Sequence, residues 1–133
     1  MNNQFDHLPF GKLKKLSELL SFEDWSVLDH YRSLDDKDFL SYWIPDKDTF
    51  YRRLLWQVSR ETLFAYLRGS VTLRNLVLGD DENASRYVVN VTPKGEFRDG
   101  VIVTAGKLSP CDIPESDSVY DYAIPKVYQA EVG

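Results

Sequence analysis

Two short segments in the middle of the chain have the pattern of extended strands, in which successive side chains lie on opposite faces and one face is apolar. Residues 38–44 read DFLSYWI, so one face of an extended segment carries leucine, tyrosine and isoleucine, and the other carries phenylalanine, serine and tryptophan. Residues 51–58 read YRRLLWQV and alternate in the same way, with Trp56 on the apolar face. Pro45 and the turn-forming residues after it separate the two segments. The pattern therefore predicts a β-hairpin over residues 38–58.

Helical spacing replaces this alternation in SRETLFAYLRGSVTLRNLVL, residues 59–78. Ser59 is suited to an N-cap, and the apolar residues after it recur every three or four positions. Gly69 is suited to the left-handed position that ends a helix. Thr72 can cap a second short helix with its own apolar stripe. We therefore expect two short helices here.

Other segments predict further strands. Residues 26–33 (SVLDHYRS), 86–91 (RYVVNV) and 101–105 (VIVTA) are short and rich in β-branched or aromatic residues. Residues 11–20 (GKLKKLSELL) fit either a helix or a strand, because their leucines have helical spacing while the leading glycine and the short length favour a strand.

These segments predict a single-domain α+β fold. We expect an antiparallel β-sheet of about five or six strands, with the two helices of residues 59–78 packed on one face. The domain should span residues 1–108. Residues 109–133 contain three prolines and no clean period, so they are interpreted as an irregular, acidic and aromatic C-terminal arm.

The charge distribution limits the classes of partner. The net charge is −5, and residues 1–79 contain 11 basic and 11 acidic residues, whereas residues 80–133 contain 5 basic and 10 acidic ones. An acidic surface repels nucleic-acid backbones, so non-specific binding of nucleic acid is not expected. The chain has one cysteine and lacks both a signal-peptide pattern and an apolar run long enough to cross a membrane, so we expect a cytoplasmic protein without membrane contact.

Two stretches of the chain resemble a known family. They are FGKLKKLSELLSFEDWSVLDHYRS and FLSYWIPDKDTFYRRLLWQVSRETLFAYLRGSVTLRNLVL. The similar features are an opening Gly-x-Leu strand, an aromatic strand ending in Trp-Ile, a Trp-containing strand running into Val-Ser-x-Glu-x-Leu, and a Leu-x-Gly-x-x-x-Leu-Arg segment. They resemble a small bacterial family, domain of unknown function 6575. The resemblance covers roughly residues 10–92. It implies an α+β fold in which residues 11–20 are a strand, and it implies no activity.

Motifs for metal, cofactor or catalytic chemistry are missing from the sequence. The two histidines, His7 and His30, lie in different segments, and the acidic loops lack the spacing of a calcium site. There is neither a glycine-rich phosphate-binding motif nor a Gly-x-Ser-x-Gly elbow. Cys111 has acidic sequence neighbours, which favours an inert thiol. We therefore expect no cofactor and no metal, and an enzyme is unsupported.

The segment 59–78 also has the spacing of a DNA-reading helix-turn-helix. Its second helix, however, offers only Arg74 and Asn75 for base or phosphate contacts, and the first adds Arg60 and Arg68. We interpret both helices as structural and expect no binding of duplex DNA.

The stretch YRRLLWQ could form a basic patch with aromatic side chains. In a strand, however, Arg52 and Arg53 point to opposite faces and cannot form one patch. We therefore expect Trp56 in the core.

The C-terminal arm contains the candidate site. Tyr120, Tyr122 and Tyr128 occur among acidic residues that include Asp117 and Asp121. The arm either folds back on the domain or binds a partner, and the sequence leaves both open.

These observations favour a small protein-binding or regulatory module, of bacterial or phage origin, that acts by surface contact with an unidentified protein partner. The alternative is a ligand-binding or enzymatic domain without a familiar motif. A third hypothesis is an acidic decoy that inhibits a nucleic-acid-binding protein. The sequence leaves the oligomeric state open.

Overall fold

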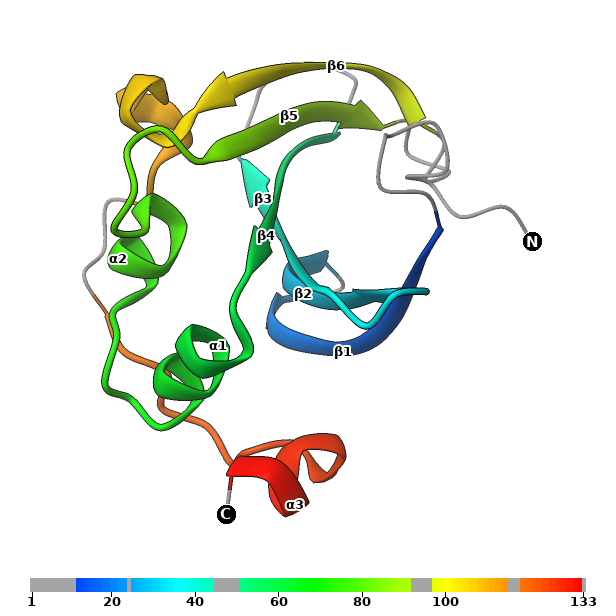
Figure 1. Ribbon diagram of the computed structural model, residues 1–133, viewed down its shortest axis with the longest axis vertical. Coiled ribbons are helices and arrows are strands. Elements are labelled where there is room, and N and C mark those ends of the chain that lie inside the picture. Colours follow the sequence, from blue (N-terminus) through cyan, green and yellow to red (C-terminus); the bar gives the residue numbers. More distant parts are fainter. Residues whose placement is uncertain (1–11, 24, 45–50, 92–96, 115–117, 133) are drawn as a thin grey trace.

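A computed structural model describes residues 12–23, 25–44, 51–91, 97–114 and 118–132 (Figure 1). It contains one six-stranded antiparallel sheet in which every strand pairs with its neighbours in the sequence. The strands are β1 (Leu13–Phe22), β2 (Trp25–Ser33), β3 (Asp38–Ile44), β4 (Tyr51–Val58), β5 (Ser85–Val91) and β6 (Phe97–Thr104). The helices are α1 (Arg60–Leu67), α2 (Leu73–Leu78) and α3 (Gln129–Val132), with 3-10 turns η1 (Ala105–Lys107), η2 (Pro110–Asp112) and η3 (Lys126–Tyr128).

The strand predictions agree with this sheet, and the largest difference in a boundary is the start of β6. The hairpin of β3 and β4 has its expected partners, and the ambiguous segment 11–20 lies mostly in strand β1. Strand β6 begins at Phe97, whereas the sequence predicted a start at residue 101. Gly100 lies just before the predicted strand, and an added Cβ there would be 3.0 Å from the Val88 carbonyl oxygen. The glycine allows a close approach of two strands rather than a turn.

The helix ends form as the sequence predicts. The Ser59 side chain accepts a hydrogen bond from the Thr62 amide, which caps α1. The Thr72 side chain caps α2 in the same way. Gly69, with φ of 81°, takes the left-handed conformation directly after Arg68, the C-cap of α1.

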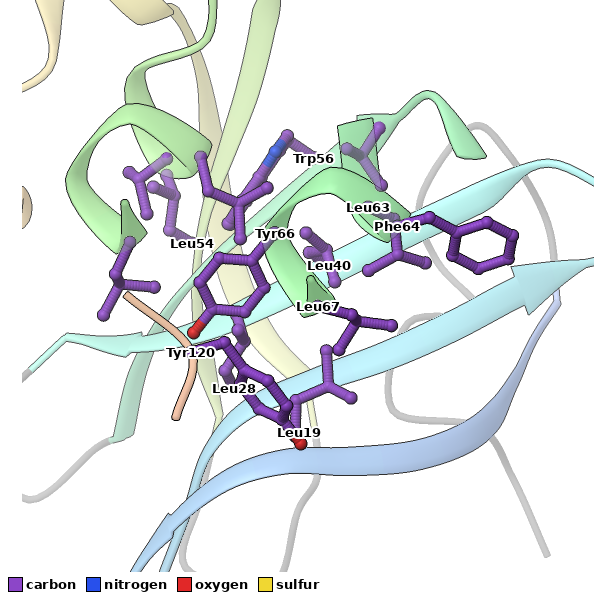
Figure 2. Packing of buried hydrophobic residues seen from close by; sticks show 14 of the residues in the cluster. Leu19, Leu28, Leu40, Leu54, Trp56, Leu63, Phe64, Tyr66, Leu67 and Tyr120 are labelled. Atoms are coloured by element: carbon purple, nitrogen blue, oxygen red, sulfur yellow. The ribbon is translucent and has the colours of Figure 1, made fainter. Parts of the chain in front are cut away.

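The main core lies between the sheet and the helices. Figure 2 shows Leu63 and Leu67 of α1 in the same cluster as Leu40 of β3 and Trp56 of β4. These side chains are all buried. Because α1 and α2 pack on one face of the antiparallel sheet, the α+β prediction is confirmed.

A smaller cluster lies on the opposite face of the sheet. It contains Leu13, Tyr31, Phe39, Leu55 and Val89. Leu55 alternates with Trp56, so consecutive residues of β4 contribute to the two clusters. The sheet therefore buries apolar side chains on both faces.

Candidate functional site

The described part of residues 109–132, here called the C-terminal segment, runs back along the helices (Figure 1). The Leu73 amide donates to the Ser118 carbonyl at 2.9 Å, and Val119 forms a β-bridge with Thr72. Arg74 donates to the Pro114 carbonyl at 3.0 Å. The beginning of α2 is thus held against the C-terminal segment.

Two of the three candidate tyrosines are buried in the main core. Tyr120 packs on Tyr66 of α1 with ring centroids 5.4 Å apart, and the two rings lie next to each other in Figure 2. Tyr128, which is 1% exposed, packs on Phe64 with centroids 6.2 Å apart. The sequence left open whether the arm folds back on the domain or binds a partner. Tyr120 and Tyr128 fold back on the domain.

The third tyrosine points to solvent. Tyr122 is 67% exposed, yet its ring packs edge-on against Tyr120 with centroids 5.5 Å apart. Asp121 is also exposed. Asp117 lies outside the described residues. The structure thus separates the candidate residues into a buried pair and an exposed pair.

A buried chain of polar groups holds Tyr128 against the sheet. Its hydroxyl lies 2.7 Å from Nδ1 of His30, and Nε2 of His30 lies 2.7 Å from Oδ1 of Asp38. A carboxylate can only accept hydrogen bonds, so Nε2 carries the proton and Nδ1 accepts from the Tyr128 hydroxyl. His30 is 0% exposed. The Tyr128–His30–Asp38 chain therefore links the C-terminal segment to strands β2 and β3.

Two arginines complete the environment of Asp38. Arg32 donates to its Oδ1 at 3.0 Å, and Arg60 of α1 donates to its Oδ2 at 2.9 Å. Burial alone would raise the pKa of Asp38, but hydrogen bonds from His30, Arg60 and Arg32 lower it below its ordinary value. The carboxylate is therefore charged and well partnered at neutral pH.

Burial dominates the titration of the other two groups in this chain. It lowers the pKa of His30, against the opposing effect of the Asp38 carboxylate. It raises the pKa of Tyr128. A neutral imidazole between a protonated tyrosine and an ionised aspartate resembles the arrangement that activates a nucleophile. Here all three groups are buried, so the arrangement positions the C-terminal segment rather than presenting a reactive atom to solvent.

A second polar network lies on the other face of the sheet. Arg53 donates to the Ser41 hydroxyl at 2.5 Å, to the Ser26 carbonyl at 2.9 Å and to Asp29 at 3.3 Å. Burial raises the pKa of Asp29, although Arg53 opposes the shift. This network gives the buried guanidinium the partners it requires.

Arg52 is directed away from Arg53. It pairs with the buried Asp112 of the C-terminal segment at 3.1 Å. The two arginines thus have separate partners, as expected for consecutive residues of a strand. Trp56 lies in the main core, which confirms its structural interpretation.

The helix-turn-helix hypothesis depended on four polar side chains. Arg60 binds Asp38 and Arg74 binds the Pro114 carbonyl, so both have partners within the protein. Arg68 and Asn75 are exposed.

The sequence did not predict that His30 and Asp38 would meet Tyr128. One signal was present: His30 is two positions from Leu28 in a strand, which places it on the core face. A buried histidine requires hydrogen-bond partners.

No metal site or membrane span was found in the part of the chain that the structure describes. Within these residues, no group of three or more histidine, cysteine, aspartate or glutamate side chains is arranged to hold a metal ion. Nor is any described helix long and apolar enough to cross a bilayer. His7 lies outside the described residues, as does the side chain of Cys111.

Comparisons with family models, with characterised proteins and with solved structures found no match. The resemblance to domain of unknown function 6575 therefore stays a prediction.

Proposed function

We propose that the protein is a small protein-binding module that acts by surface contact, with Tyr122 as the anchor for its partner. The observation that carries this proposal is the side chain of Tyr122, which is 67% exposed and whose ring packs edge-on against the buried ring of Tyr120. Tyrosines are frequent among the residues that dominate binding energy at protein interfaces. Asp121, exposed beside it in the sequence, favours a partner with a basic rim.

The fixed position of the C-terminal segment supports this role. The Val119–Thr72 bridge precedes Tyr122 in the sequence, and the buried Tyr128 follows it. A residue held at both sides loses little conformational entropy when it binds. Tyr122 is thus better suited to a contact than the same side chain on a free tail.

Partner capture tests the proposal. The wild-type protein would be used to capture interacting proteins from the native host, with identification by mass spectrometry. Tyr122→Ala should reduce the amount of captured partner at least tenfold, as expected for a central interface residue. Leu34→Ala is the matched control, because Leu34 is 89% exposed in a turn between β2 and β3. Equal capture by wild type and Tyr122→Ala would refute the proposal.

The same proposal includes three further points: the protein is cytoplasmic, it is of bacterial or phage origin, and it does not bind duplex DNA. The contacts of Arg60 and Arg74 within the protein support the last of these. An enzymatic or ligand-binding role stays the alternative, and an acidic decoy is the third hypothesis.

A further inference from the structure

The sheet ends in two edge strands, β1 and β6, and β1 carries features that prevent pairing with another chain. Its register with β2 shifts at three places, between Lys15 and Ser17, Glu18 and Leu20, and Leu20 and Ser21. Lys14, Lys15 and Glu18 are exposed along it. Irregular backbone and charged side chains are the usual means by which proteins protect a sheet edge.

Strand β6 differs at each of these points from Gly100 onward. Its first part resembles β1, because it contains Arg98 and Asp99 and its register with β5 shifts once, between Asn90 and Val91. Its register with β5 is continuous from Ser85–Thr104 to Asn90–Asp99, and among the described residues it pairs with β5 alone. Within the strand, residues 100–104 read GVIVT and contain no charge. Val101 is 60% exposed and Ile102 is 61% exposed. From Gly100 to Thr104 the strand therefore offers a regular, uncharged edge rich in β-branched residues, which is a template for a further strand.

The two exposed side chains lie on opposite faces of the sheet. Val101 is opposite Val88, which belongs to the main core on the helix side, and Ile102 is opposite Tyr87 on the other side. A strand added at this edge would therefore cover an apolar residue on each face, in addition to forming backbone hydrogen bonds.

We propose that β6 pairs in an antiparallel manner with β6 of a second copy of this chain, which joins two sheets about a two-fold axis. A two-fold contact requires a surface that is complementary to itself. Valine and isoleucine on both strands satisfy this requirement, because β-branched side chains pack well in cross-strand pairs. The chain has a net charge of −5, so two copies repel each other, and an uncharged strip is the place where this repulsion opposes contact least.

The contact should be weak and dependent on concentration. It consists of one strand of eight residues from each copy, which is smaller than the interface of a stable dimer. We expect a dissociation constant on the order of 10 µM. Dimerisation does not involve Tyr122, so it can be tested independently of the proposed partner binding.

Sedimentation equilibrium from about 1 to about 300 µM measures this association around the expected dissociation constant. The wild-type protein should change from monomer to dimer over the range. The variant Val101→Lys/Ile102→Lys should raise the dissociation constant at least tenfold, because like charges would face each other across the two-fold axis. Leu34→Lys introduces a lysine at an exposed leucine away from β6, and it should dimerise like the wild type.

A second variant tests the same contact in case the two lysines disturb folding. Ile102→Thr retains a β-branched side chain and removes its apolar surface, so it should weaken the dimer while leaving the circular dichroism spectrum unchanged. A wild-type protein that is monomeric at every concentration would overturn the proposal. So would a dimer that survives Ile102→Thr and the double lysine variant, since another surface would then form it.

Discussion

Tyr128 offers the sharpest test of how the C-terminal segment belongs to the fold. Replacing Tyr128 with phenylalanine keeps the ring but removes the hydroxyl that donates to His30 at 2.7 Å. Nδ1 of His30 is then a buried acceptor without this donor. Leaving a buried polar group unpaired costs about 1 to 3 kcal/mol, which is the decrease in unfolding free energy that we expect.

Tyr128→Ala should have a larger effect. It also removes the ring that packs on Phe64, and Tyr128 is almost completely buried. Truncation of a buried aromatic side chain to alanine costs about 3 to 5 kcal/mol. Small domains have unfolding free energies of about 5 to 15 kcal/mol, so this variant should lose a large fraction of its stability.

Urea denaturation followed by tryptophan fluorescence measures these differences, and urea resolves changes of this size. Tyr122→Ala is the control in the same segment, because its side chain is exposed and its replacement should change the unfolding free energy by less than about 0.5 kcal/mol. The expected order of stability is wild type and Tyr122→Ala, then Tyr128→Phe, then Tyr128→Ala. A wild-type unfolding free energy for Tyr128→Ala would refute the reasoning, since the C-terminal segment would then contribute nothing to the core.

Three further predictions concern the core, the buried histidine and the helices. Leu63→Ala and Leu67→Ala should each lower the unfolding free energy by about 2 to 5 kcal/mol, and a wild-type urea midpoint would contradict the buried placement. Because the pKa of His30 is lowered in the folded protein, the unfolded chain binds the extra proton, so stability should fall as the pH drops below about 6.5. His30→Gln should make the unfolding free energy less dependent on pH between about 7 and 5, and an unchanged slope in urea titrations would count against a neutral buried imidazole. Fluorescence anisotropy with mixed-sequence DNA duplexes at about 150 mM salt should show no binding tighter than about 10⁻⁴ M, whereas submicromolar binding that is lost in Arg74→Ala would restore the helix-turn-helix hypothesis.

Local signals were sufficient to predict most of the sheet and the two short helices α1 and α2. The alternation of side chains in β3 and β4 is a local pattern. The helix caps Ser59 and Thr72 are local signals too, because each one acts on residues a few positions away. The start of β6 was predicted too late because Gly100 and the charged residues before it are typical of turns. Only the pairing of β5 with β6 shows that Gly100 is needed for close packing of strands.

The polar networks depend on contacts that no local pattern contains. His30 and Tyr128 are 98 positions apart, and nothing near either residue identifies the other. Arg53 and Asp29 meet across the intervening strand β3. Strand alternation predicted that Arg52 and Arg53 would diverge, but it could not name their partners.

The three tyrosines of the C-terminal segment show why composition alone left its role open. They lie in a stretch without a helical or strand period, so the sequence gives no face on which to place them. Their environments are decided by where the segment crosses the helices: Tyr120 meets Tyr66, and Tyr128 meets Phe64 and His30. Tyr122 rests on Tyr120 and is left facing solvent. Because the two buried tyrosines fix the backbone on either side of the exposed one, folding back on the domain is compatible with the proposed binding of a partner through Tyr122.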